Sequence, residues 1–395
     1  TASGKTVNIN GRDFRFKVTG EMETLFNQTQ FGLRRDDWGN WFGNNNPNWL
    51  WHIHLPLHYI SRNRQLIARD TKKMLFNYRD SRRCFPISPQ MERPNGPNQY
   101  GNVTSANSAS PYRGGLFGAE FERSVFISEP VHNLVHREVL EPDGVTFTSR
   151  RAKGEEKTEF LASADNWFRP TMTKTGPDGA LYVADMYRLV IEHPQWIPPT
   201  MQSRVNLREG ADRGRIWRVF PKGSKLRKTP ILETKPTKEL VSLLDSPNGW
   251  QRDTIHRLLL DRKDKSASID LRRLVGTAKN PKVRLQALCI LEGLKGLDGK
   301  VLKQALADSH PGVREHAVRV CENEHADLIA SRIKDESIRV RRQVGFSLGE
   351  WKDRRAAEAL VELAIADSQE PRVQLAVKSS ALPHAAAMLK IIFQA

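Results

Sequence analysis

The chain has 395 residues, of which 38% are hydrophobic and 27% are charged, so it can bury a core and is not a globally disordered protein. It contains no run of about 18 apolar residues, which excludes a membrane-spanning helix in this sequence. The formal charge of +17 is spread along the chain, apart from a short basic stretch at 223–235. Proteins that bind nucleic acid usually concentrate their charge on one face or helix, so we expect no nucleic-acid partner.

Residues 1–222 have the pattern of an all-β domain. Short apolar runs at 125–128, 135–140 and 145–149 are separated by turn signals such as Pro142-Asp143-Gly144. Runs of this length between turn signals are typical of antiparallel strands. The segment therefore predicts several short strands joined by tight turns.

Two of the apolar runs end on an acidic side chain. The run 125–128 ends at Glu129, and the run 181–184, which follows a Pro-Asp-Gly turn, ends at Asp185. A turn, a strand and a terminal polar group that recur along a chain are typical of a β-propeller, whose innermost strands carry their last side chains to one mouth of the central channel. We therefore expect this domain to be the C-terminal part of a six-bladed β-propeller, with its functional site at that mouth.

The chain changes character after the basic linker at 223–235. From residue 236, a signature rich in Pro, Val and Arg recurs about every thirty residues and precedes an apolar helix each time; it lies at 246–252, 280–284, 310–314, 336–341 and 370–374. Proline favours the first position of a helix, where its missing N–H costs nothing. We expect residues 236–395 to form an all-α solenoid of HEAT-like repeats. Its valines, Val283, Val313, Val340 and Val373, should be buried, and each arginine should bond a neighbouring repeat.

Several motifs together resemble one family. They are Gln28-Thr29-Gln30-Phe31-Gly32, Asp36-Asp37-Trp38-Gly39-Asn40-Trp41-Phe42-Gly43, and the stretches 129–138, 167–185 and 190–198. These motifs are similar to those of the PVC-type haem-binding proteins, a family of membrane-bound dehydrogenases. The resemblance implies a propeller like that of soluble quinoprotein sugar dehydrogenases, then HEAT repeats, then a cytochrome c module. The sequence holds no Cys-x-x-Cys-His motif for such a module, and we expect the chain to be an internal piece of a longer protein.

The resemblance implies a quinoprotein-type dehydrogenase that oxidises a sugar or a polyol. Its cofactors would be a PQQ-type quinone and calcium, with haem c only on the missing module, and its location would be extracytoplasmic, either periplasmic or membrane-associated. The repeats would act as a docking arm toward the cytochrome c module or another protein. The alternative is a non-catalytic propeller that binds carbohydrate or protein, with the solenoid as a scaffold.

The strand ends and the resemblance together point to five residues at the channel mouth, namely Glu129, His132, Asn133, Arg169 and Asp185. His132 is the candidate base for taking a proton from a sugar hydroxyl, and the alternative is a structural histidine bonded to a loop. Arg169 is the candidate anion clamp, and the alternative is a salt bridge to one of the two acids. Glu129, Asn133 and Asp185 are the candidate cofactor-binding residues, although acids at strand ends often cap loops. The long polar inserts 86–112 and 194–212 are expected to be lids.

The histidines do not predict a metal centre. On a strand His132 and His136 would lie about 13 Å apart, which is too far to share one ion. His52 and His54 share one face of a strand, with His58 nearby, and a hydrogen-bonded packing role is favoured over a metal site for them.

Overall fold

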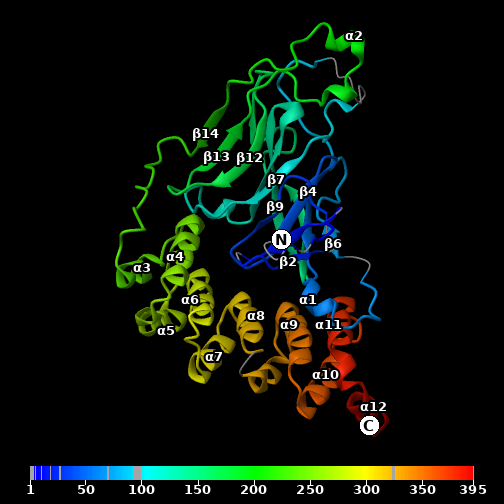
Figure 1. Cartoon of the computed structure of the whole chain (residues 1–395), viewed down its shortest axis with the longest axis vertical. Helices are drawn as coiled ribbons and strands as arrows, with labels where there is room; N and C mark the ends of the chain where they lie inside the picture. The colour runs from blue at the N-terminus through cyan, green and yellow to red at the C-terminus, as the bar shows by residue number, and fades with distance from the viewer. Residues whose placement is uncertain are drawn as a thin grey trace. The chain divides into compact units, whose positions relative to one another are not determined.

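The structure is a computed structural model that describes residues 4, 6–9, 11–17, 19–25, 28–68, 71–91, 99–322 and 325–394. The chain forms two compact units, seen in Figure 1. The first unit comprises Thr1–His54 and Thr71–Thr229 and is rich in β-sheet, whereas the second comprises Leu55–Asp70 and Pro230–Ala395 and is helical. The prediction of a β-rich part followed by a helical part is therefore confirmed. Over the described ranges, no helix combines the length and apolar character needed to cross a membrane.

Four antiparallel sheets make up the described part of the first unit. Within each sheet the strands follow chain order: β1-β2, β3-β4-β5-β6, β7-β8-β9-β10 with β11 beside β9, and β12-β13-β14. The strands are β1 (Phe14–Phe16), β2 (Met22–Thr24), β3 (Arg34–Arg35), β4 (Trp41–Asn45), β5 (Asn48–Ile53), β6 (Lys72–Met74), β7 (Asn107–Pro111), β8 (Ser124–Glu129), β9 (Leu134–Asp143), β10 (Thr146–Arg151), β11 (Leu161–Ala162), β12 (Pro170–Thr175), β13 (Leu181–Asp185) and β14 (Arg215–Val219). These described sheets are separate and do not close into a ring.

The predicted strands and turns are confirmed. The runs 125–128, 135–140 and 145–149 fall on β8, β9 and β10. Gly144, between β9 and β10, has φ +58°, a left-handed conformation that glycine adopts without steric cost. β8 ends at Glu129 and β13 ends at Asp185, so both acids stand at strand ends as the sequence predicted.

The sheet of β7 to β10 is covered on both faces, and β8 shows why. Side chains alternate between the two faces of a strand, so successive residues of β8 enter different cores. Val125 and Ile127 pack into a core with residues of β4 and β5, whereas Phe126 packs into a second core with Leu181 and Val183 of β13. The three larger sheets therefore pack against one another in chain order.

The second unit is a row of stacked helices (Figure 1). Its α-helices are α1 (Leu57–Ile60), α3 (Thr237–Leu243), α4 (Gly249–Arg262), α5 (Ser268–Thr277), α6 (Pro281–Gly293), α7 (Gly299–Leu306), α8 (Pro311–Val320), α9 (Ile338–Ser347), α10 (Arg354–Ala366), α11 (Pro371–Ala381) and α12 (Ala385–Gln394). Helices α4, α6, α8, α9 and α11 pack one on the next in that order. Proline opens α6, α8 and α11, and Val283, Val313, Val340 and Val373 are fully buried, which confirms the predicted helix starts.

Arginine–aspartate pairs join successive repeats at three of the five signatures, those of Arg284, Arg314 and Arg341. In each pair, two guanidinium nitrogens donate to the two carboxylate oxygens of an aspartate that precedes the next stacked helix. The pairs are Arg284–Asp308 at 2.6 and 2.6 Å, Arg314–Asp335 at 2.8 and 2.8 Å, and Arg341–Asp367 at 2.8 and 2.8 Å. Asp308 and Asp335 also accept a backbone N–H group at the start of that helix, from His310 at 2.8 Å and from Ser337 at 2.9 Å. These two pairs therefore fix both the repeat contact and a helix start.

One segment lies where the sequence did not predict it. Leu55–Asp70 falls between β5 and β6 along the chain, yet it belongs to the helical unit, where its short helix α1 packs beside α11. The chain thus leaves the β unit after His54, joins the helical unit, and returns at Thr71.

Candidate functional site

The ends of β8 and β13 border a small cavity in the first unit. Its volume is about 120 Å³. The lining comes from the turn after β8, from the segment that follows β13, and from both long polar inserts; among the residues involved are Tyr100, Val131, His132, Asn133, Arg169, Ile191, Ile197 and Met201. The prediction that the inserts 86–112 and 194–212 cover this end thus agrees with the lining, although 92–98 lies outside the described residues.

A tight turn brings His132 back over Glu129. The turn consists of one 3-10 helix, Pro130–His132, and it ends at Asn133, whose φ of +56° reverses the chain direction. His132 Nδ1 lies 3.0 Å from Glu129 Oε1, and the backbone N–H of Gly101 donates to His132 Nε2 at 3.1 Å. Because Nε2 accepts a hydrogen bond, the imidazole proton is on Nδ1 and is donated to the carboxylate.

Glu129 is fully buried, and its carboxylate accepts several hydrogen bonds from protein donors. Besides His132, it accepts hydrogen bonds from the Ser105 backbone N–H at 2.9 Å and the Ser105 hydroxyl at 2.6 Å. A buried carboxylate is tolerated only when such donors replace water. Together Glu129 and His132 fasten residues 101–105 to the end of β8.

The Arg169 guanidinium donates to four backbone carbonyl oxygens. Nη1 bonds Pro130 at 2.9 Å and Val131 at 3.3 Å, while Nε bonds Arg188 at 2.9 Å and Nη2 bonds Leu189 at 2.6 Å. The side chain therefore ties the turn after β8 to the segment after β13. An anion clamp at this position would require some of these hydrogen bonds to break first.

Asn133 lines the cavity, and Asp185 holds the backbone of Arg169, which also lines it. Asn133 Nδ2 donates to the Phe168 carbonyl at 2.6 Å. Asp185 accepts the Arg169 backbone N–H at 2.8 Å and the Trp217 indole N–H at 2.9 Å, and it pairs with Arg215 at 2.9 Å. Both side chains are buried, and both hold neighbouring backbone or strand β14 in place.

The structure thus brings the five predicted residues together. His132, Asn133 and Arg169 line one cavity, and Glu129 and Asp185 lie behind it in hydrogen bonds to two of them. Their polar groups are directed at protein partners, whereas the rest of the lining is mainly aliphatic, with Glu192 contributing a carboxylate. Such a site is suited to holding a small apolar group with one hydrogen-bond donor.

The other histidines have separate surroundings. His52 Nδ1 lies 2.8 Å from the Thr146 hydroxyl, and the His52 ring packs 5.1 Å from the Phe147 ring. His58 lies on α1 in the helical unit. Over the ranges that the structure describes, no three His, Cys, Asp or Glu side chains gather as a metal-binding group.

A buried charge cluster around His136 was not predicted. His136 Nε2 lies 2.9 Å from Glu138 and Nδ1 lies 2.7 Å from Glu159, which also pairs with Arg151 at 3.0 Å. Trp49 stacks on the imidazole with ring centroids 4.2 Å apart. Burial disfavours the charged imidazole, but the two carboxylates outweigh burial and raise the pKa of His136. The spacing of His136 and Glu138, two residues apart on one strand, is the only sequence signal for this cluster.

Glu159 also borders a wider hollow of about 520 Å³ whose lining includes Arg83, Cys84 and Lys157. Burial raises the pKa of the Cys84 thiol, so the thiolate that reactive cysteines require is disfavoured there. Cys84 is therefore not an activated nucleophile in this hollow.

Comparison with protein-family models relates the β unit to a known family. A search of curated proteins finds no match to this chain. A family model described as a domain of unknown function, DUF7133, matches residues 1–223, which is more than half of the chain and ends close to the end of the β unit. The chain therefore belongs to the DUF7133 family.

Proposed function

We propose that the first unit is a non-catalytic propeller-type domain whose cavity holds an apolar group of a protein partner, and that the second unit is a HEAT-like scaffold. The propeller assignment is supported by the sheets β3-β4-β5-β6, β7-β8-β9-β10 and β12-β13-β14, in which strands pair in chain order and each sheet packs on the next. Consecutive blades of a propeller have this arrangement. The repeat assignment is supported by the stacked helices and their recurrent arginine–aspartate pairs.

The binding role is supported by one observation: the polar side chains His132 and Arg169 in the cavity wall are hydrogen-bonded to the protein backbone. A general base needs a lone pair that can reach a substrate, and here Nε2 of His132 accepts the Gly101 N–H. An anion clamp needs free guanidinium donors, and those of Arg169 point to carbonyl oxygens. Both side chains act as parts of the wall, so the arrangement favours binding over chemistry.

The size of the cavity supports a small occupant. Pockets for cofactors and drug-sized ligands measure about 300–1,000 Å³, whereas this cavity measures about 120 Å³. A sugar would also need several polar partners, and the described lining offers mainly aliphatic side chains. An apolar side chain that bears one donor, facing Glu192, fits both the volume and the chemistry.

Thermal unfolding with a small probe tests this proposal. Phenol has an apolar ring and one O–H donor, and it should stabilise the protein by about 2.7 kcal/mol at a hundredfold excess over its Kd. Ile191→Trp, which fills the cavity, should abolish this effect, whereas Ile216→Trp on β14, where the side chain is 75% exposed, should not. Equal stabilisation of both variants, or none of the wild type, would contradict the proposal.

The dehydrogenase proposed from the family resemblance is the second candidate. It is favoured by one observation, the buried Glu129–His132 pair beside the cavity, which resembles a carboxylate-oriented base. The residues present do not fit a bound quinone or calcium, however, because Arg169, Glu129 and Asp185 are directed to protein partners and the cavity is small. Glucose-dependent reduction of a dye in the presence of pyrroloquinoline quinone and calcium would favour this candidate over the first.

A further inference from the structure

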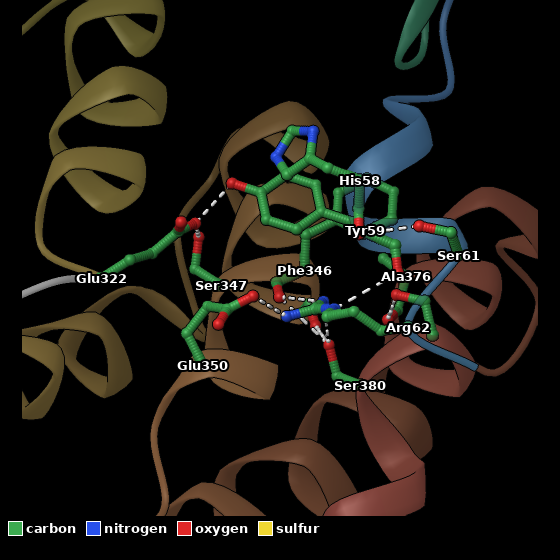
Figure 2. A network of polar contacts seen from close by, with 12 residues as sticks. His58, Tyr59, Ser61, Arg62, Glu322, Phe346, Ser347, Glu350, Ala376 and Ser380 are labelled. Atoms are coloured by element: carbon green, nitrogen blue, oxygen red, sulfur yellow. Dashed lines mark hydrogen bonds and ion pairs between the residues drawn. The ribbon is translucent and has the colours of Figure 1, made fainter. Parts of the chain in front are cut away.

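The segment Leu55–Asp70 contacts the helical unit as a peptide ligand contacts a groove. Leu55, Tyr59 and Ile60 are 6%, 1% and 2% exposed, and they share one apolar cluster with Phe346 of α9 and Ala376 of α11. The Tyr59 and Phe346 rings stack with centroids 4.9 Å apart and planes 8° apart (Figure 2). Tyr59 and Ile60 lie on α1 and Leu55 lies just before it, so the segment lays a short apolar helical turn in a hydrophobic groove, a recurring mode of peptide recognition.

The hydroxyl group of Tyr59 lies in a polar pocket formed by Glu322, Gln343 and Ser347. The hydroxyl donates to the Glu322 carboxylate, and the Ser347 hydroxyl donates to the same carboxylate (Figure 2). The Tyr59 hydroxyl also accepts from Gln343 Nε2 at 2.9 Å. Burial raises the pKa of Glu322, although the hydrogen bonds from Ser347 and Tyr59 oppose it. Phenylalanine at position 59 would remove one hydrogen bond from Glu322 and one from Gln343, leaving Ser347 as their shared partner, so the pocket favours tyrosine.

Arg62 donates a hydrogen bond to a backbone carbonyl at the C-terminal end of helix α9. Its Nη2 donates to the Phe346 carbonyl at 2.6 Å and to the Ser380 hydroxyl at 3.0 Å, and its Nη1 pairs with Glu350 at 2.6 Å. The last carbonyls of a helix lack partners within the helix, and an arginine is well suited to them. Gly349 makes room for this contact, since a Cβ there would lie 2.6 Å from Arg62 Nη1.

We propose that the face formed by α9, by the 3-10 turn Leu348–Glu350 and by α11 is a recognition site for a short helical peptide that carries Tyr and Arg three residues apart. Its occupant is this chain's own segment Leu55–Asn63, which acts as a tethered ligand. A tethered ligand is present at an effective concentration of about millimolar or more, so it keeps the face occupied against free competitors.

Peptide binding in trans tests this assignment. The probe is a fluorescein-labelled peptide with the sequence of residues 55–68, and the receptor is the full chain in which Tyr59→Ala and Arg62→Ala disable the tethered copy. The peptide should bind this receptor at least tenfold more tightly than it binds the wild type. The same peptide with Tyr59→Phe and Arg62→Ala should not bind, and a control chain with Arg64→Ala, at an exposed position, should behave as wild type.

Two further measurements guard against a misfolded receptor. Adding Gly349→Val to the receptor should remove peptide binding while the helical circular dichroism is retained. In Arg62→Ala alone, amide hydrogen exchange of residues 57–63 should accelerate at least tenfold while α4 to α6 stays unchanged. Peptide binding that is equal in wild type and receptor, or exchange that is unchanged in Arg62→Ala, would overturn the proposal.

Discussion

At the scale of single residues, the charge cluster around His136 is the most demanding feature of the β unit. Two carboxylates, an imidazole and the Arg151 guanidinium share a space in which Glu138, His136 and Glu159 side chains are fully buried. Burial disfavours ionisation of Glu159, but His136 and Arg151 outweigh it and lower the pKa of that carboxyl. Each charge is therefore stable only because the others are present.

Removing the imidazole should destabilise the β unit strongly. His136→Ala leaves Glu138 and Glu159 without their shared partner and removes the stacking on Trp49. Breaking a buried ion pair in this way costs about 3–5 kcal/mol. Urea unfolding at pH 6 measures the loss, and His193→Ala, at an exposed histidine, is the matched control with an expected effect below about 0.5 kcal/mol.

The same variant should change how stability depends on pH. The pKa of His136 is raised from 6.5 in the folded state, so its contribution is complete below pH 6.5 and is lost as pH rises through the folded pKa. The pKa of Glu159 is lowered from 4.5, so its contribution is present above pH 4.5 and is lost as pH falls through the folded pKa. Wild type should therefore lose stability more steeply than His136→Ala as pH rises above 6.5, and parallel curves would contradict the charged imidazole.

The sequence located the candidate site better than it described its chemistry. The acids at two strand ends, Glu129 and Asp185, and the position of His132 three residues after Glu129 were enough to predict that five residues lie together. Their partners were not predictable, because Gly101 and the carbonyls of Arg188 and Leu189 belong to irregular segments whose path no periodicity fixes. His136 was missed because it lies within an apolar run that reads as an ordinary buried strand.

At the scale of elements, the arginine–aspartate pairs explain why the repeat signature contains an arginine. Arg314 and Asp335 side chains are 6% and 2% exposed, and the arginine also donates to the carbonyls of Asp308 and Ser309. A planar guanidinium can satisfy a carboxylate and a helix start together, which a lysine cannot. The period predicted these contacts, because each unit must bond the next one in the stack.

Substituting Arg314, which forms a buried ion pair, should cost more stability than substituting an arginine of an exposed ion pair. Arg314→Ala leaves Asp335 buried without its bidentate partner and should cost the helical unit about 3 kcal/mol, with Arg314→Lys recovering part of the loss. Arg257→Ala breaks the pair with Asp261, in which the side chains are 62% and 63% exposed, and should cost less than about 0.5 kcal/mol. Thermal unfolding followed by circular dichroism at 222 nm makes the comparison. Equal losses of stability in the two variants would argue against a stabilising role of the buried arginine–aspartate pairs.

The segment Leu55–Asp70 shows where pattern analysis fails at this scale. It has no repeat period and lies between two strands, so no pattern in the sequence separates it from the β domain. Its place is set by tertiary contacts of Tyr59 and Arg62 with residues almost three hundred positions away, such as Phe346. Contacts over that separation leave no local signal.

At the scale of the whole molecule, the linker between the two units does not separate all of their residues along the chain. The basic linker ends the β unit near Thr229, and Arg227 fastens its first half to the carbonyls of Gly114 and Gly115 at 2.8 and 3.0 Å. Lys225 and Lys228 remain exposed within the linker, and Lys222 is exposed just before it. Because Leu55–Asp70 belongs to the helical unit, the N-terminal part of the chain supplies a piece of that unit as well.

Limited proteolysis should therefore cut the chain without separating its halves. Trypsin at low ratio should cleave first after Lys222, Lys225 or Lys228, since exposed linkers are preferred sites. The two fragments should still elute together in gel filtration, because the buried anchors Tyr59 and Ile60 of the N-terminal fragment remain in the groove of the C-terminal fragment. After the same cut, the Tyr59→Ala, Arg62→Ala chain should elute as two separate species. A resistant core that spans the linker would refute the boundary, whereas wild-type fragments that separate at once would refute the groove as the contact that joins them.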